Sequence, residues 1–290
     1  MIDIKGYFDV VTCTVSYLVV DSNTSAAAVI DPVLDYDLQT EKMETRSADL
    51  ILKELRLKKL DLLWSLETHI HADHLSASDY IRTNTGAKIG ISTRICEVQE
   101  SFSDLFNLEK LNGEKNYFDF FFEDGKQFEL GSETFTVLHT PGHTPACVTY
   151  IVNNYAFVGD TLFMPDYGTG RTDFRGGDAR ELYRSIQKIL NLPKNYRVLV
   201  GHDYRPESRD HPIWESSVSE QRALNIHVGG NISEDKFISM REDRDSLLPK
   251  PALMLPALEV NLRGGCLPLP ETEGTSYLKL PINILDLPNL

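Results

Sequence analysis

Cysteine is scarce in this sequence: the chain has 290 residues and only four cysteines, which lie far apart. No two of them have the Cys-x-x-Cys spacing that zinc knuckles use. The four positions are Cys13, Cys96, Cys147 and Cys266. We therefore expect buried thiols in a reducing cytoplasm.

Positive charge is also in short supply. The chain has 29 Lys and Arg residues against 43 Asp and Glu residues, which gives a net charge of −14. Phosphate backbones require clustered Lys and Arg, so this balance argues against a nucleic-acid partner. Long apolar runs of membrane-spanning length are absent, and the sequence does not open with a basic segment followed by an apolar one. We expect a cytoplasmic protein with a small-molecule substrate and no membrane partner.

The composition is otherwise that of a globular protein, with 41% hydrophobic residues and enough length for one large domain. Apolar patterns predict alternating strands and helices, which favour layers of sheet and helix. We expect a catalytic domain over residues 1–215, with helices and a Pro-rich tail in 216–290 packed on the same domain. Strands are predicted over 2–8, 15–20, 27–30, 60–66, 87–92, 127–130, 133–138, 147–152, 155–158 and 197–200, and helices over 47–57, 75–83, 178–190 and 217–244.

Ionisable side chains crowd into residues 68–75, Thr-His-Ile-His-Ala-Asp-His-Leu, directly after the buried strand predicted over 60–66. In an extended chain residues i and i+2 point the same way, so His69 and His71 should face one side together. We expect the chain to turn at Ala72 and Asp73.

The next residues should continue the cluster. Asp73 and His74 are expected at the start of the helix over 75–83. Four ligand-type side chains would then converge at the end of one strand. Imidazole and carboxylate groups suit zinc, iron and manganese, so the cluster predicts a metal site.

Three further ligand-type residues follow predicted strands: His143, Asp160 and His202. Loops held by a rigid scaffold are where such folds carry their sites. His143 lies in a rigid Thr-Pro-Gly-His-Thr-Pro loop, and Asp160 and His202 each follow a glycine. We therefore expect these loops to complete the metal site.

Aromatic residues gather in the charged segment 100–126, which has no clear periodicity. Three interpretations are open: a lid over the site, a contact between two copies in a homodimer, or a small apolar cluster under a long loop. The residues do not decide between them.

Four elements occur in a fixed order: His-x-His-x-Asp-His at 69–74, His143 after Thr-Pro-Gly, Asp160 after a strand, and Gly-His-Asp-Tyr at 201–204. Together they resemble the metallo-β-lactamase superfamily over nearly the whole chain. The resemblance implies an α/β fold, an αββα sandwich with the metal site between its two sheets.

Two families of that superfamily compete. Glyoxalase II-type thioesterases hold two metals on seven residues, all of which are present here. Persulfide dioxygenases carry the same seven but bind one iron, Fe(II), on the residues that correspond to His69, His143 and Asp160, a set of two histidines and one carboxylate. The seven positions are His69, His71, Asp73, His74, His143, Asp160 and His202.

The loop after Asp160 favours the dioxygenases. Residues 168–174 read Gly-Thr-Gly-Arg-Thr-Asp-Phe, which is similar to the dioxygenase motif GxGRTDF. Glyoxalase II usually has a Lys and a Tyr there for glutathione. Asp31-Pro32, His202-Asp203-Tyr204 and Asn261-Leu262-Arg263 are similar to the dioxygenases as well, and most of all to the bacterial subgroup called β-lactamase-like hydrolase, a sulfur dioxygenase.

The resemblance implies an enzyme that oxidises glutathione persulfide with O2 to sulfite and glutathione, in sulfide detoxification, with one Fe(II) per chain. It implies catalytic roles for Tyr204, whose hydroxyl would point toward the open coordination positions, and for groups that orient ligands and solvent. Those groups are His71, Asp73, His74 and His202.

Substrate contacts are expected from Tyr204, Arg171 and Arg263. Arg171 has a second interpretation, an ion pair with Asp173 that fixes the loop, and Arg263 has a second interpretation as an ordinary surface residue. The alternative function is a dinuclear zinc thioester hydrolase, hydroxyacylglutathione hydrolase, which the ligand count equally permits. A non-catalytic or RNA-processing member of the superfamily is disfavoured by the intact ligand set and by the acidic charge.

Overall fold

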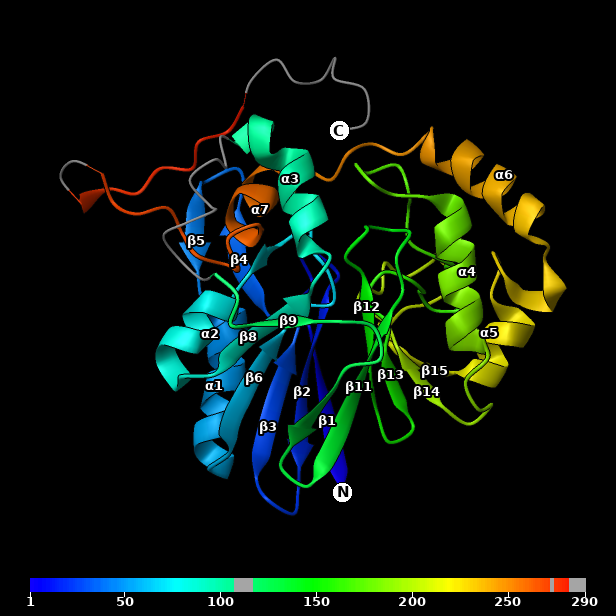
Figure 1. Ribbon diagram of the computed structural model, residues 1–290. Helices are drawn as coiled ribbons and strands as arrows, with labels where there is room; N and C mark the ends of the chain where they lie inside the picture. The colour runs from blue at the N-terminus through cyan, green and yellow to red at the C-terminus, as the bar shows by residue number, and fades with distance from the viewer. Residues whose placement is uncertain (107–116, 272–273, 282–290) are drawn as a thin grey trace.

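Two six-stranded β-sheets stack face to face in the computed structural model, which describes residues 1–106, 117–271 and 274–281 (Figure 1). The first sheet has the order β1 (Ile2–Phe8), β2 (Val15–Asp21), β3 (Ala26–Ile30), β6 (Asp61–Leu66), β8 (Lys88–Ser92), β9 (Phe120–Phe122). The second has the order β10 (Gln127–Leu130), β11 (Glu133–His139), β12 (Val148–Val152), β13 (Tyr155–Phe157), β14 (Arg197–Leu199), β15 (Glu215–Ser217). A small third sheet joins β5 (Lys42–Glu44), β4 (Val33–Asp37) and β7 (Leu75–Ser76).

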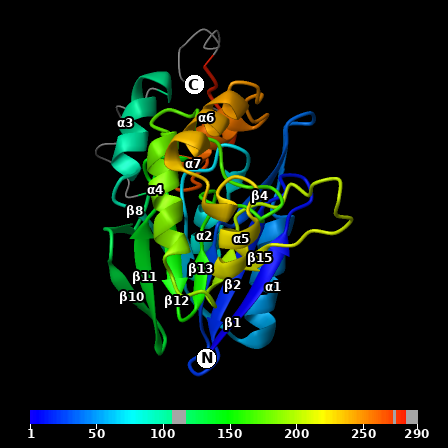
Figure 2. The same ribbon diagram turned by 90° about the vertical axis from the view of Figure 1, so that its right-hand side faces the viewer.

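Helices cover both outer faces of the sheets. On the side of the first sheet lie α1 (Arg46–Lys58), α2 (Ser78–Thr85), α3 (Ile95–Phe106) and α7 (Met254–Asn261). On the side of the second lie α4 (Ala179–Leu190), α5 (Val218–Leu224) and α6 (Glu234–Asp245), which face the viewer in Figure 2. This order of layers confirms the predicted αββα sandwich. Among the described residues, every helix is too short or too polar to cross a membrane.

Strand β2 shows why the layers stack as they do. All seven of its residues are buried, as expected for a strand with both faces covered. Tyr17 and Val19 pack between the sheets with Phe135, whereas Leu18, pointing the other way, packs under α1 with Ile51. Each such fully buried side chain contributes ~1.5–3 kcal/mol, so the alternation fixes the register of the strand.

Local signals set several helix boundaries. The helix predicted over 178–190 is α4, and the side chain of Asp178 accepts a hydrogen bond from the backbone N–H of Glu181 at 2.8 Å. At α5, Ser217 and Glu220 form a capping box, each accepting from the backbone N–H of the other.

Three predictions about secondary structure were wrong in part. The helix predicted over 75–83 begins only at Ser78, because Leu75 and Ser76 pair with β4, a strand that the pattern did not indicate. Asp73 and His74 therefore lie in a turn before β7 rather than at a helix start. The segment 217–244 is two helices, separated by a turn in which Gly230 has a φ of 63°.

The Pro-rich tail contains α7, which the sequence did not predict. Pro256 lies in the first turn of this helix, where its missing N–H has no intrahelical partner to lose. Ala257 and Leu258 are buried, so this part of the chain belongs to the core.

Two of the four cysteines are buried, as predicted, and two are not. Cys147 and Cys266 are buried, but Cys96 is exposed and Cys13 is half-buried, because they lie on the surface helix α3 and in the loop between β1 and β2.

The aromatic segment is only partly described, since residues 107–116 lie outside the described residues. Phe102 and Phe106 on α3, and Phe118 beyond the gap, are buried in one apolar cluster with Leu258 of α7. These contacts favour the apolar-cluster interpretation for those three side chains. Whether the segment acts as a lid or a dimer contact stays a prediction.

The helices after residue 215 pack on the same layers as the residues before it. Val218 and Phe237 share a buried cluster with Leu182 and Ile186 of α4. The division at 215/216 itself stays a prediction.

Candidate metal centre

The predicted ligand loops meet at one edge of the sandwich, opposite the N-terminus (Figure 1). The histidine cluster follows β6, His143 lies between β11 and β12, and Asp160 and His202 follow β13 and β14. The β-bridge between Thr14 and His202 ties the two sheets together beside this edge.

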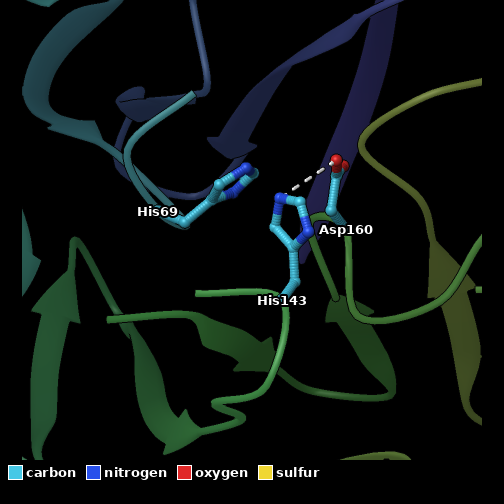
Figure 3. A group of neighbouring side chains, drawn as sticks. All are labelled: His69, His143 and Asp160. Atoms are coloured by element: carbon cyan, nitrogen blue, oxygen red, sulfur yellow. Dashed lines mark ion pairs between the residues drawn. The ribbon is translucent and has the colours of Figure 1, made fainter. Parts of the chain in front are cut away.

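His69, His143 and Asp160 form a buried group of side chains drawn from three loops (Figure 3). Each of them offers one ligand atom, and these atoms lie within 4.8 Å of one another. The Nε2 of His143 lies 3.7 Å from Oδ2 of Asp160. The sequence predicted that these three residues would meet, and the structure brings them together.

The ring of His69 is oriented by a short relay. Its Nδ1 lies 3.0 Å from Oγ1 of Thr68, and that hydroxyl donates to Oδ2 of Asp31 at 2.7 Å. Because the hydroxyl proton is engaged by Asp31, Nδ1 is the donor to Thr68 and Nε2 carries the lone pair. This buried Nε2 has no hydrogen-bond partner among the described residues. Burial and the neighbouring imidazoles hold the pKa of His69 well below its ordinary value, which keeps the ring neutral.

The ring of His143 is oriented in the same manner. Its Nδ1 lies 2.7 Å from the carbonyl oxygen of Arg171, which can only accept. Nδ1 therefore carries a proton, and Nε2 faces Asp160. In both histidines Nε2 is thus the nitrogen turned toward the shared group of ligand atoms, where a metal ion would bind.

His202 lies between two carboxylates. Its Nδ1 is 2.7 Å from Oδ1 of Asp160, and its Nε2 is 2.6 Å from Oδ2 of Asp73. Burial alone would lower the pKa of His202, but Asp160 and Asp73 outweigh it and hold the pKa well above its ordinary value. The ring of Tyr204 stacks on His202 with 5.2 Å between centroids. His202 and Tyr204, the two residues of the Gly-His-Asp-Tyr motif that were predicted to act at the site, therefore lie side by side there.

His71 faces a different set of groups. Its Nε2 lies 3.1 Å from Oδ1 of Asp31 and 3.3 Å from Oε2 of Glu67. Burial acts to lower the pKa of His71, but these carboxylates raise it to about 10. Glu67 was not predicted as a site residue, although it directly precedes the histidine motif; it also accepts hydrogen bonds from Ser76 and Ser78.

A second set of side chains has metal-compatible spacing. The ligand atoms of His71, Asp73 and His74 also lie within 4.8 Å of one another. The Nδ1 of His74 lies 3.1 Å from the carbonyl oxygen of Leu75, and its Nε2 has no hydrogen-bond partner among the described residues. Burial and the charge of His71 lower the pKa of His74 to about 4, so this ring is neutral.

The loop that carries Arg171 is held by residues of α6 that the sequence did not indicate. Asp245 accepts from the backbone N–H of Thr172 at 2.8 Å and from the guanidinium of Arg241 at 2.6 Å. Arg241 also donates to the carbonyl oxygen of Thr169 at 3.1 Å. At Gly170 the backbone N–H donates to the carbonyl oxygen of Asp160, and a Cβ at Gly170 would lie only 2.1 Å from that oxygen.

Asn261 holds the histidine loop from the other side. Its side-chain amide donates to the carbonyl oxygens of His71 and His74 at 2.8 Å each, and its oxygen accepts from the backbone N–H of Ser76 at 2.7 Å. The sequence drew attention to Asn261 only as the first residue of the dioxygenase-like motif Asn261-Leu262-Arg263. It did not indicate which residues Asn261 contacts.

A cavity of about 980 Å³ opens onto the centre. His143, Asp160, Tyr204 and Arg171 all line it, as expected for residues at a reacting centre and its rim. Arg263 does not line it, because its guanidinium turns back to the carbonyl oxygen of Glu259 within α7. The predicted substrate contact of Arg263 therefore finds no support in its position.

The donor set fits a metal ion. Two imidazoles and one carboxylate converge in a buried pocket, and the unpaired buried Nε2 of His69 is costly unless something binds it. The hydrogen bonds to Thr68, Arg171 and His202 fix the orientation of each of the three ligands.

The sequence pattern of the Metallo-beta-lactamase superfamily matches residues 11–202, which include all of these ligand loops. The chain belongs to the metallo-β-lactamase superfamily. Its two sheets with flanking helices are then the superfamily fold.

Two relatives place it more closely within the superfamily. The chain is 47% identical over 283 residues to the "Beta-lactamase hydrolase-like protein" of Xylella fastidiosa (strain 9a5c), covering 98% of this chain and 65% of that protein's length. It is 33% identical over 265 residues to "Persulfide dioxygenase ETHE1, mitochondrial" of Homo sapiens, covering 90% of this chain and 88% of that one.

A solved structure is also similar to this chain. The crystal structure of ETHE1 from Myxococcus xanthus has a TM-score of 0.73 and 30% sequence identity to this chain. The match covers 91% of this chain and 100% of that one.

Proposed function

We propose that this protein is an iron-dependent persulfide dioxygenase that oxidises glutathione persulfide. The balanced reaction is GSSH + O2 + H2O → GSH + SO3²⁻ + 2 H⁺. One observation carries the proposal: the ligand atoms of His69, His143 and Asp160 lie within 4.8 Å of one another, while His202 is engaged by two carboxylates and His71 faces two others. Two histidines and one carboxylate with open positions are the donor set of non-haem Fe(II) oxygenases.

The comparisons support the same reaction. A relative with 33% identity is named a persulfide dioxygenase, and the matching solved structure bears the same ETHE1 name. The bacterial relative with 47% identity has a hydrolase-like name. That name describes the superfamily rather than a substrate, so a direct assay has to distinguish the reactions.

The residues of this chain have separable roles in the proposal. His69, His143 and Asp160 hold one Fe(II), which when bound supplies the redox chemistry between persulfide sulfur and O2. Thr68 and the carbonyl of Arg171 keep the ring protons of the two histidines turned away from the ion. Burial, together with Asp73 and Asp160, holds the pKa of Tyr204 well above its ordinary value, so its hydroxyl stays protonated and can donate a hydrogen bond into the cavity.

His71, Asp73, His74 and His202 act on those ligands rather than on the ion. His202 donates to Asp160 and so directs the other oxygen of that carboxylate toward His143. Asp73 stabilises the positive charge of His202. Holding substrate and ligands in one orientation converts a collision into a near-unimolecular encounter.

One observation favours the alternative, a dinuclear zinc thioester hydrolase. His71, Asp73 and His74 form a second set of compatible spacing beside the first. In that reaction two metals would activate water and stabilise the oxyanion of a thioester. The Nδ1 of His71 has no hydrogen-bond partner among the described residues, so the ring would not have to move. Asp31 and Glu67 raise the pKa of His71 to about 10, however, and a protonated imidazole does not bind a metal, which disfavours this function.

Metal analysis of anaerobically purified protein tests the proposal, together with oxygen uptake on glutathione persulfide and hydrolysis of S-lactoylglutathione. We expect about one iron per chain, oxygen uptake and no thioester hydrolysis. Two zinc ions per active chain with thioester turnover would contradict the proposal and establish the alternative.

A further inference from the structure

Six basic side chains line the cavity, and four of them are already paired. The guanidinium of Arg171 donates to both oxygens of Asp173 at 2.6 Å and to the carbonyl oxygen of Pro249 at 2.8 Å. Arg241 pairs with Asp245 at 2.6 Å. Lys42 and Arg46 both pair with Glu44. Each of these four side chains therefore already has a carboxylate partner within the protein.

The acidic side chains of the cavity are engaged as well. Near its mouth, each carboxylate accepts hydrogen bonds from its own surroundings: Asp9 from Thr12, Asp35 from Ser47, Asp37 from the backbone of Gln39 and Thr40, and Glu44 from Lys42. At its base, Asp73 and Asp160 face His202. Each of these carboxylates thus already has a partner within the protein.

Arg244 and Lys250 are the exception. Both line the cavity and are exposed, and among the described residues neither side chain has a hydrogen bond or an ion pair. Arg244 lies in the last turn of α6, and Lys250 in the connection from α6 to α7, drawn in orange in Figure 1. Leu248, Pro249 and Pro251 line the cavity beside them. Arg244 and Lys250 are therefore cations that line the cavity without a protein partner among the described residues, next to an apolar wall.

We propose that Arg244 and Lys250 form an anion-binding site that holds the carrier portion of the thiol substrate, through its carboxylate or phosphate groups. This inference rests on the proposed function. A guanidinium binds either anion with two parallel hydrogen bonds, and an ammonium adds a movable point charge. The cavity of about 980 Å³ is at the upper end of the range for small-molecule sites, so it can hold a carrier with several charged groups.

This assignment replaces the expected carboxylate contact of Arg171. Its three donor positions already have partners, so binding a substrate carboxylate would require it to release Asp173. Arg244 and Lys250 give up nothing within the protein when they bind an anion, which makes them the better candidates.

Isothermal titration calorimetry with non-reactive thioethers tests the site on the iron-loaded protein. The probes are S-methylglutathione, its diethyl ester, and S-methyl-coenzyme A, and the variants are Arg244→Gln and Lys250→Gln. Lys236→Gln is the matched control, because Lys236 is exposed on the same α6 but lies outside the cavity. We expect each variant to raise the Kd of the preferred probe roughly tenfold and the control to leave it unchanged.

The probes identify the anion. Tighter binding of S-methylglutathione than of its diethyl ester assigns carboxylates, and tighter binding of S-methyl-coenzyme A assigns phosphates. Equal binding of all three probes, no binding of any, or an unchanged Kd in both variants would overturn the site.

The test also separates this site from the reaction. If the original protein consumes oxygen with glutathione persulfide but Arg244→Gln and Lys250→Gln bind the probes normally, the proposed function stands and the anion site is wrong. If the two variants lose probe binding but the original protein does not oxidise persulfides, the anion site stands and the proposed function is wrong.

Discussion

The Nδ1 of His143 lies 2.7 Å from the carbonyl oxygen of Arg171, a residue on a different loop. This contact makes Nε2 the free nitrogen of the ring, so a backbone carbonyl determines which atom of His143 can bind a metal. The carbonyl is in turn placed by Asp245, which accepts from the next backbone N–H, that of Thr172. An ion pair in α6 is therefore linked to a metal ligand through one loop.

Replacement of Asp245 by Asn should weaken metal binding. The loop loses its anionic acceptor and Arg241 loses its buried partner, so His143 is less firmly oriented. We expect the iron dissociation constant, measured by competition with a chelator, to rise ~10–100-fold. Asp243→Asn, on the exposed face of the same helix, is the control. A lower melting temperature with unchanged iron affinity would show that the ion pair serves only folding.

Alanine at two histidines should separate ligands from orienting groups. His143→Ala should abolish iron binding, because a three-residue donor set leaves no spare ligand. His74→Ala should retain most iron but lose activity ~10–100-fold, the range for groups that act on ligands. Iron content and oxygen uptake of the two purified variants decide this, with exposed His211→Ala as the control. Equal loss of iron from both would mean that the single-ion assignment is wrong.

Local patterns predicted the parts of the site that depend on neighbouring residues. The apolar run before His69 placed the cluster at a strand end, and the i, i+2 rule placed His69 beside His71, whose ring centroids are 4.1 Å apart. The acidic residue before α4 likewise predicted its cap, Asp178.

Long-range partners could not be predicted in this way. Asp245 bonds Thr172 across 73 residues, and Asn261 bonds His71 across 190. No periodicity relates such positions, because the contact exists only after the helices pack on the loops. The helix that carries Asn261 was also hidden by Pro256, which reads as a break but fits in a first turn.

Replacement of Arg171 by Lys should act on stability more than on substrate binding. Lysine cannot reproduce the two parallel hydrogen bonds to Asp173, a partly exposed pair of the kind that contributes at most ~1 kcal/mol. We expect the melting temperature to fall by about 2 °C and KM for glutathione persulfide to stay within about twofold. A KM raised roughly tenfold or more, at unchanged melting temperature and iron content, would instead restore Arg171 as a substrate contact.

The pH dependence of stability should depend on His227. Burial, with Arg241 and Arg244, lowers the pKa of His227 to about 3, and its Nδ1 accepts from the backbone N–H of Thr169. The unfolded chain takes up this proton below about pH 6.5 and the folded chain does not, so folding stability falls as the pH drops from 6.5 toward 3. His227→Gln keeps an acceptor for Thr169 but cannot titrate. Its stability relative to the original protein should therefore improve by about 2 kcal/mol between pH 7.5 and 5, in urea unfolding of the metal-free chains. Exposed His211→Gln should show no such change, and a constant difference at every pH would mean that the pKa of His227 is the same in the folded and unfolded chains.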